Sequence, residues 1–227
     1  KCNSGILEID NLSVSYKNRT IFRNASFTAN RGDIIAVTGC NGSGKSAFLR
    51  VLCGLMKEKA GRIVFDGKLY PYKKRRKLCY MTMQDVVHQL FSDSVWEEFA
   101  LLNKNVNEEE IICILKRLDL LDYRDKHPMT LSGGQKQRLA LAVATMANKD
   151  IMVFDEPTSG LDYSNMLKVC ELIKELSIGK IVFVATHDRE LQDMLCNRKI
   201  EIVNASVIIN DLVVNKKGGF GETSFLR

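Results

Sequence analysis

A glycine-rich octapeptide between a short apolar run and a helical pattern constrains the fold of this chain more than any other feature. The octapeptide, Gly39-Cys40-Asn41-Gly42-Ser43-Gly44-Lys45-Ser46, matches the pattern G-x-x-x-x-G-K-S. Residues 34–37 before it are continuously apolar, which is typical of a buried parallel strand. After it, apolar residues from Ala47 to Met56 recur at helical spacing. A strand, a tight turn and a helix in this order predict an α/β fold.

This octapeptide has the chemistry of a phosphate-binding loop. Its glycines allow successive backbone N–H groups to face a phosphate chain, and the amino end of the following helix adds positive potential. Lys45 is then expected to contact the β- and γ-phosphates of a nucleotide, and the Ser46 hydroxyl to bind Mg²⁺. The alternative is a glycine turn that happens to precede a helix, but the glycines, the lysine and the serine all stand in the required positions.

Two adjacent acids follow a second apolar run. Residues 151–154 predict another buried strand, and Asp155 and Glu156 stand at its end. Asp155 is expected to hold Mg²⁺ through water, and Glu156 to act as the base or to position the attacking water. Turns commonly contain Asp and Glu, so the pair is informative only together with the phosphate-binding loop on another strand of the same sheet.

The remaining patterns divide the chain into segments of different type. Alternation from Leu7 to Tyr16, a short stretch at 25–27 and a turn signal at Asp66-Gly67 predict antiparallel strands. Residues 92–148 have helical spacing, and Asn107 before three glutamates predicts a helix start. Strand patterns recur at 78–83, 181–185, 200–203 and 207–209, and the last two predict a terminal hairpin.

The composition is that of a globular protein, with 45% hydrophobic and 26% charged residues, 15 Gly and 3 Pro, and it excludes a disordered or collagen-like chain. No apolar run approaches the roughly 20 residues of a membrane-spanning helix, and residues 1–10 do not resemble a signal peptide. We therefore expect a soluble, cytosolic chain. The seven cysteines include no Cys-x-x-Cys pair, which argues against a disulfide framework and a zinc site.

The net charge of +6 is largely local, because five positive charges stand in the run 73–77 and removing them leaves +1. A nucleic-acid surface spread over the whole protein is therefore not indicated, and no nucleic-acid partner is expected. The run itself is expected to be a solvated loop at the edge of the strand lobe. Its alternatives are binding of acidic lipid headgroups or of nucleic acid.

The motif Leu131-Ser132-Gly133-Gly134-Gln135 resembles the signature of ATP-binding cassette (ABC) proteins, and the resemblance extends from Leu7 to about Ile209. Asp155-Glu156 corresponds to the Walker B pair. Tyr16 resembles the aromatic residue that stacks on adenine, and Gln84 resembles the Q-loop glutamine near Mg²⁺. Ser159-Gly160-Leu161-Asp162 resembles the D-loop, and His187 resembles the switch histidine at the γ-phosphate.

The resemblance implies one α/β domain over residues 1–227: a P-loop NTPase (RecA-like) core with a parallel sheet, an N-terminal antiparallel β-subdomain and an inserted α-helical subdomain. We expect the β lobe at about 1–33 and 60–77 and the core at 34–59, 78–91 and 149–215. The helical signature lobe is expected at 92–148 and a tail at 216–227.

The resemblance also implies that two cassettes pack head to tail, with ATP and Mg²⁺ between Lys45 of one and Ser132 of the other. Gly133, Gly134, Gln135 and Asp162 belong to the same shared pocket. A transmembrane subunit is the further expected partner. The chain is then expected to be cytoplasmic and peripheral on the inner face of the cell membrane, with membrane contact only through this partner.

Some of these residues have simpler interpretations. Tyr16 can be a core aromatic residue on its strand, and His187 a capping or core histidine. Cys40 stands where many ABC relatives carry proline. Its side chain need not contact phosphate, so normal nucleotide binding is expected, although oxidation or alkylation of an exposed thiol there would block the loop.

The segment after Gln84 contains Gln89-Leu90-Phe91, which resembles energy-coupling-factor and cobalt-type importers, so import of a vitamin or metal ion is favoured. Leu90, Phe91 and Trp96 are expected either to line a groove for the transmembrane partner or to pack internally. One alternative is another ABC importer or an exporter. The other is a soluble ABC ATPase acting on DNA or ribosomes, which the sequence disfavours because it shows neither a long coiled coil nor a second cassette. Whether the chain is half of a fused two-cassette protein stays open.

Overall fold

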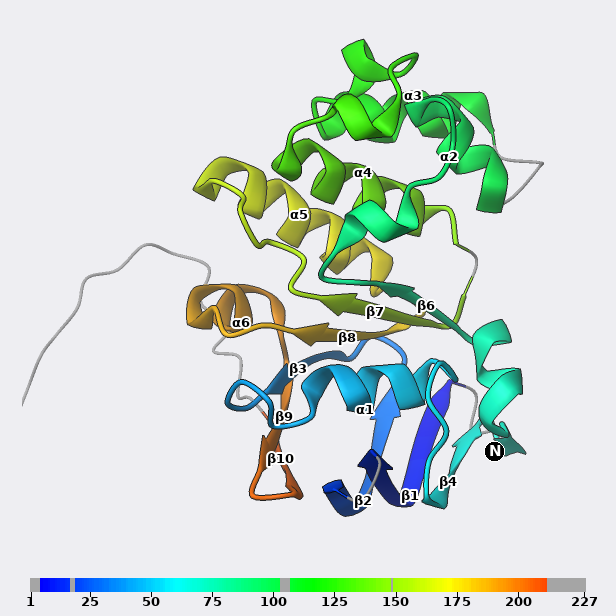
Figure 1. The fold of residues 1–227 in the computed structure, drawn as a ribbon, viewed down its shortest axis with the longest axis vertical. Helices are drawn as coiled ribbons and strands as arrows, with labels where there is room; N and C mark the ends of the chain where they lie inside the picture. The colour runs from blue at the N-terminus through cyan, green and yellow to red at the C-terminus, as the bar shows by residue number, and fades with distance from the viewer. Residues whose placement is uncertain (1–4, 17–18, 103–106, 148, 212–227) are drawn as a thin grey trace, which may run out of the picture.

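Two sheets of different type build the protein, and the computed structural model describes residues 5–16, 19–102, 107–147 and 149–211 (Figure 1). The smaller sheet is antiparallel, with four strands in the order β2-β1-β4-β5. These strands are β1 Ile6–Tyr16, β2 Arg19–Asn30, β4 Ala60–Phe65 and β5 Lys68–Leu69. The predicted turn at Asp66-Gly67 joins β4 to β5, and β2 is longer than the stretch 25–27 predicted from the sequence.

The larger sheet has six strands in the order β10-β9-β3-β8-β7-β6. They are β3 Ile34–Thr38, β6 Cys79–Thr82, β7 Ile151–Asp155, β8 Ile181–Ala185, β9 Arg198–Val203 and β10 Ser206–Asp211. All neighbouring pairs are parallel except β9 and β10, which form the predicted terminal hairpin. The carboxyl ends of five parallel strands therefore meet at one edge of the sheet, where α/β proteins usually bind their ligands.

Helices cover both faces of this sheet (Figure 1). They are α1 Lys45–Leu52, α2 Val95–Leu102, α3 Glu108–Arg117, α4 Gly133–Thr145, α5 Tyr163–Leu176 and α6 Arg189–Leu195. Short 3₁₀ helices are η1 Tyr72–Lys77, η2 Val86–Gln89, η3 Leu121–Tyr123 and η4 Pro128–Thr130. The predicted start at Asn107 is confirmed, because its side chain accepts a hydrogen bond from Glu109 N at 3.0 Å and so caps α3.

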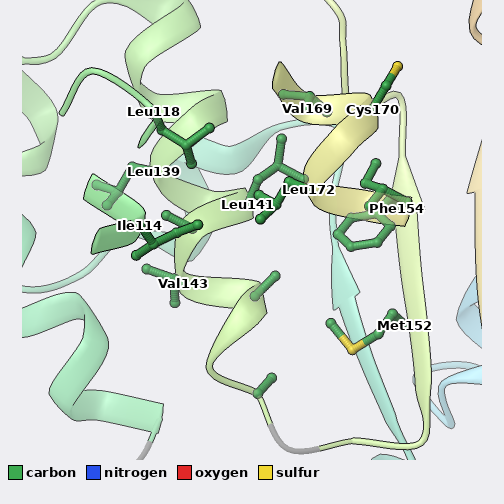
Figure 2. Packing of buried hydrophobic residues seen from close by; sticks show 14 of the residues in the cluster. Ile114, Leu118, Leu139, Leu141, Val143, Met152, Phe154, Val169, Cys170 and Leu172 are labelled. Atoms are coloured by element: carbon green, nitrogen blue, oxygen red, sulfur yellow. The ribbon is translucent and has the colours of Figure 1, made fainter. Parts of the chain in front are cut away.

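Alternate residues of β7 divide the core in two. Ile151 and Val153 pack toward α1 and the antiparallel sheet, whereas Met152 and Phe154 pack toward the helices of the opposite face. Figure 2 shows part of the second cluster, in which the labelled side chains come from α4, α5, β7 and the end of α3. Since both faces of β7 are buried, the continuous apolar run before Asp155 is explained. The observed α/β architecture confirms the predicted fold class.

The interpretation of residues 73–77 as a solvated loop was wrong in part. These residues lie in η1, and Arg75 is buried with only 1% of its surface exposed. Its guanidinium donates hydrogen bonds to Tyr70 O (2.8 Å), Val51 O (3.0 Å) and both carboxylate oxygens of Glu58 (2.7 and 2.9 Å). The other four cations of the run are exposed. A guanidinium with several donors can be buried only where partners of this kind surround it.

No helix among the described residues is both long and apolar enough to cross a membrane. The expected tail at 216–227 lies outside the described residues.

Candidate functional site

A cleft of about 1120 Å³ opens at the carboxyl edge of the six-stranded sheet. The segments that end or follow β1, β3, β6, β7 and β8 all contribute to its wall. Most of the predicted site residues line it: Tyr16, Cys40, Asn41, Gly42, Ser43, Gly44, Lys45, Ser46, Gln84, Asp155, Glu156 and His187. Residues separated by more than a hundred positions thus meet in one place because their parallel strands end at the same edge.

The phosphate-binding loop joins β3 to α1, as predicted. Gly39, Gly42 and Gly44 have φ angles of +140°, +77° and +114°, which favour glycine. At Gly44 a Cβ atom would lie 2.2 Å from Ile21 Cγ2, so a larger residue is also excluded by space. Helix α1 begins directly at Lys45. The lysine ammonium donates to Gly39 O at 2.8 Å and to Cys40 O at 3.3 Å, which holds this charge against the loop.

Asp155 ends β7 as a buried carboxylate beside the start of α1. Burial raises its pKa, while a hydrogen bond with the Ser46 hydroxyl and the positive charges of Arg50 and Lys45 act against this rise. A carboxylate, a hydroxyl and the Gln84 carboxamide are hard oxygen donors of the kind Mg²⁺ prefers. Within the described residues no group of three or more His, Cys, Asp or Glu could hold a metal ion. Ser46, Asp155 and Gln84 are the side chains of the cleft that would hold Mg²⁺, together with oxygens of a bound ligand.

Glu156 follows in a left-handed conformation with φ of +53° and is only 8% exposed. Its backbone N–H donates to Ala185 O at 2.9 Å, and its carbonyl accepts from Gln137 Nε2 at 3.3 Å. These bonds hold a conformation that costs about 1–3 kcal/mol for a non-glycine residue. Burial raises the pKa of the Glu156 carboxyl. The nearby His187 acts to lower this pKa, and the negative charge of Asp155 acts to raise it further.

His187 Nδ1 lies 3.0 Å from Glu156 Oε1, but the approach lacks hydrogen-bond geometry, and this buried oxygen has no hydrogen-bond partner among the described residues. An unsatisfied carboxylate oxygen facing the cleft fits a residue that accepts a hydrogen bond from water or substrate there. The His187 side chain is 65% exposed and Tyr16 is 62% exposed, so neither is a core residue. Both remain able to contact a ligand in the cleft.

The signature residues lie on a different surface. Ser132 Oγ accepts from Gln135 N at 3.3 Å, and Gln135 Oε1 accepts from Ser132 N at 2.8 Å, so the two residues form a capping box that starts α4. Gly134 packs close to Leu161, since a Cβ there would lie 3.3 Å from Leu161 Cδ2.

Asp162 caps α5 by accepting from Asn165 N at 2.9 Å, and its hydrogen bonds from Asn165 lower its pKa. The structure thus places Ser132, Gly133, Gly134, Gln135 and Asp162 outside the set of residues that line the cleft.

Several residues of the cleft were not predicted from the sequence. Arg50 lines it, and its position four residues after Ser46 on α1 is a helical spacing that would have indicated it. The β9–β10 turn also lines the cleft through Asn204 and Ala205, and Ala205 O accepts a hydrogen bond from Arg23 N at 3.0 Å. No local pattern in the sequence indicates that this turn approaches β2.

Comparison with known proteins assigns the chain to a family. The family model "ABC transporter" matches residues 22–159. A protein of Treponema denticola named "Putative ABC transporter ATP-binding protein" is 44% identical over 210 residues, which are 92% of this chain and 43% of that protein. The energy-coupling factor transporter ATP-binding protein EcfA1 of Fusobacterium nucleatum is 37% identical over 197 residues, 81% of this chain and 74% of its own length.

Among solved structures, cbiO1 of Clostridium perfringens, described as part of the ABC transporter complex cbiONQ, is 30% identical with a TM-score of 0.77, covering 91% of this chain and 88% of that one. The chain spans less than half the length of the Treponema denticola relative. The motifs, the cleft and these similarities agree: the chain belongs to the ABC transporter family, whose ATP-binding members are ATPases, and it is similar to the energy-coupling-factor type.

Proposed function

We propose that the chain is the ATP-hydrolysing subunit or domain of an ABC transporter, in which ATP-driven closure of two cassettes is coupled to transport. One observation carries this proposal: the phosphate-binding loop, Asp155, Glu156 and His187 share one cleft, whereas the signature residues lie on a separate surface. A site divided in this way is complete only when a second cassette supplies the missing half.

Within the cleft each side chain has a defined task. Tyr16 stacks on the adenine ring, and Lys45 leaves the carbonyls of Gly39 and Cys40 to contact the β- and γ-phosphates. Ser46, Asp155 and Gln84 would hold Mg²⁺, which neutralises phosphate charge when bound.

Glu156 orients a water molecule and takes its proton at Oε1, the oxygen that has no other hydrogen-bond partner among the described residues. A pKa raised by burial makes this carboxylate a stronger base than an exposed one. His187, beside it, contacts the γ-phosphate.

The signature surface supplies the opposite wall of a pocket in the second cassette. The first N–H groups of α4 and the positive end of its dipole face outward at Ser132, Gly133 and Gly134, where they favour an anion. Ser132 Oγ accepts from Gln135 N, so its own O–H stays available to donate to a phosphate oxygen. ATP thus joins the two cassettes, and hydrolysis removes the contacts that held them together.

The segment after Gln84 supports a transmembrane partner. Phe91 is 75% exposed and Val87 is also exposed, whereas Leu90 is buried and Trp96 packs against the core. The exposed pair therefore suits a docking groove for a transmembrane subunit, and Leu90 and Trp96 support it from within. The proposed cargo is a vitamin or metal ion, as the resemblance of Gln89-Leu90-Phe91 to energy-coupling-factor and cobalt-type importers implies, and the similarity to an energy-coupling factor transporter protein supports this transporter type. The chain then works at the cytoplasmic face of the membrane, bound through its transmembrane partner.

A Glu156→Gln variant tests the proposal, because it keeps the shape of the site and removes the base. With saturating Mg-ATP the variant is expected to accumulate as a dimer in size-exclusion chromatography, while the unchanged chain hydrolyses ATP and stays mainly monomeric. Lys45→Ala in the same background is the control and is expected to abolish the dimer. A Glu156→Gln chain that stays monomeric at saturating Mg-ATP would contradict the proposal.

A further inference from the structure

The carboxamide of Gln89 closes the loop that carries Gln84. Strand β6 ends at Thr82, η2 spans Val86–Gln89, and Gln84 lies between them. The Gln89 side chain turns back to the strand: Nε2 donates to Met81 O at 2.9 Å, and Oε1 accepts from Met83 N at 2.7 Å. One side chain thus joins the two ends of the segment 83–89.

These two bonds pair with backbone groups at the open edge of the six-stranded sheet. β6 is the edge strand of the six-stranded sheet, and Leu78 O accepts from Ile151 N on its inner side. Because backbone groups of successive strand residues point to opposite sides, Met81 and Met83 face the open edge. A residue of a further parallel strand would bond to the same carbonyl and N–H, two residues apart. The Gln89 carboxamide therefore pairs with β6 as an added strand would.

Gln89 does not line the cleft, whereas Gln84, which lies within the closed loop directly after Met83, does. The loop is further fixed by Asp85, which caps η2 by accepting from Val87 N at 3.1 Å, and by the buried side chain of Val86. Val87 of this segment is exposed, and so is Phe91, two residues after the segment ends. The segment is thus one closed unit between the cleft and the surface.

We propose that Gln89 is a positioning residue that holds Gln84 at the metal side of the cleft and ties its position to that of Val87 and Phe91. This inference rests on the proposed function. A displacement of Val87 or Phe91 by a bound partner would be transmitted to Gln84 because the Gln89 bonds prevent the loop from deforming independently. Gln89 itself touches neither nucleotide nor metal.

The chain offers a matched control on another strand. Asn197 Oδ1 accepts from Ile34 N at 2.9 Å, and its Nδ2 donates to Gly32 O at 3.3 Å, so it also bridges two backbone groups two residues apart. This bridge lies at the start of β3, at the opposite edge of the sheet from the cleft. Asn197→Ala therefore removes an equivalent pair of bonds without disturbing Gln84.

The test compares Gln89→Ala, the near-isosteric Gln89→Glu and Asn197→Ala in the full chain. Loss of the two bonds is expected to speed hydrogen exchange at the Met83 amide by about tenfold in Gln89→Ala, without an effect in Asn197→Ala. In both Gln89 variants kcat for ATP hydrolysis is expected to fall about tenfold with KM for ATP unchanged, since ATP itself does not contact Gln89. The Mg²⁺ concentration for half-maximal ATP binding, which needs no turnover, is expected to rise several-fold.

A double-variant cycle isolates the role of Gln84. If Gln89 acts only through Gln84, Gln89→Ala will cause no further loss in a Gln84→Ala background. Equal losses in both backgrounds, unchanged Mg²⁺ dependence, or an equal loss of kcat in Asn197→Ala would overturn the inference. Failure of the unchanged chain to bind Mg-ATP would instead contradict the proposed function, and the exchange rate at Met83 would still show whether the Gln89 bonds hold the loop.

Discussion

Replacing Arg75 with alanine is expected to lower the free energy of unfolding far more than a change at a lysine-rich surface run normally would. The variant removes four hydrogen bonds: two to the carbonyls of Tyr70 and Val51 and two to the carboxylate of Glu58. Val51 lies in the last turn of α1, the helix that begins at Lys45. Arg75 thus ties this helix to η1 and to the segment that carries Glu58.

The magnitude follows from burial. Arg75 is 1% exposed, and the Glu58 side chain is also largely shielded from solvent, so the variant leaves a carboxylate without its partner. Breaking a buried pair in this way costs about 3–5 kcal/mol, whereas an exposed pair contributes about 0–1 kcal/mol. For a chain of this size the larger loss corresponds to a fall of roughly 10 °C in Tm.

The assay is thermal or urea unfolding of Arg75→Ala beside Arg62→Ala. Arg62 pairs with Asp10 at 3.0 Å, but both side chains are exposed, so this control is expected to change stability by less than about 1 kcal/mol. Burial alone would raise the pKa of Glu58, but the bonds from Arg75 and from its own backbone outweigh it and lower the pKa. The contribution of the pair is therefore fully present above the ordinary pKa of 4.5 and is lost as pH falls through the lower folded-state value. Equal losses in the two variants at neutral pH would refute the reasoning.

Three further predictions concern the cleft. Gly44→Ala is expected to lose ATP binding, measured by calorimetry, because its Cβ would meet Ile21 and φ is +114°; unchanged affinity would contradict the described loop geometry. Burial raises the pKa of Glu156, so this carboxylate is protonated at a higher pH than an exposed glutamate. As the pH is lowered, turnover is therefore expected to decline earlier than it would with an exposed glutamate as the base. A pH–rate profile with an ordinary carboxylate pKa would count against this role. Cys40 is exposed in the loop, so Mg-ATP is expected to slow its alkylation by more than about tenfold, as measured by mass spectrometry. Cys113, which is exposed outside the cleft, is the control and is expected to react at an unchanged rate. Equal alkylation rates at Cys40 with and without Mg-ATP would show that nucleotide does not cover it.

The parts of the fold that depend on local patterns were predictable from the sequence. The loop at Gly39 to Ser46 lies between β3 and α1 because an apolar run and a helical spacing flank it. Asp155 and Glu156 meet this loop because parallel strands end at the same edge. The terminal hairpin and the helices of residues 92–148 were likewise indicated by periodicity.

The parts that depend on contacts distant in sequence were not predictable. Arg75 stands among four exposed cations, and only the folded chain brings Tyr70, Val51 and Glu58 around it. The β9–β10 turn reaches the cleft because Ala205 pairs with Arg23, 182 positions away in the chain. The role of Gln89 depends on β6 being an edge strand, which the strand pattern alone does not reveal.

The proposed assembly of each ATP pocket from two copies is tested most directly by mixing two variants, each expected to be inactive alone. In the proposed dimer, Lys45→Ala removes the lysine expected to bind phosphate and Ser132→Arg blocks the signature surface, so each homodimer would have two defective pockets. A mixed dimer would have one intact pocket, formed by Lys45 of one copy and Ser132 of the other.

In an equal mixture we expect ATPase activity of about one quarter of that of the unchanged chain, since half of the random dimers are mixed and each has one of its two pockets intact. The activity is also expected to rise steeply with protein concentration. A mixture as inactive as its components, or a Ser132→Arg chain that hydrolyses ATP at the unchanged rate, would contradict the account.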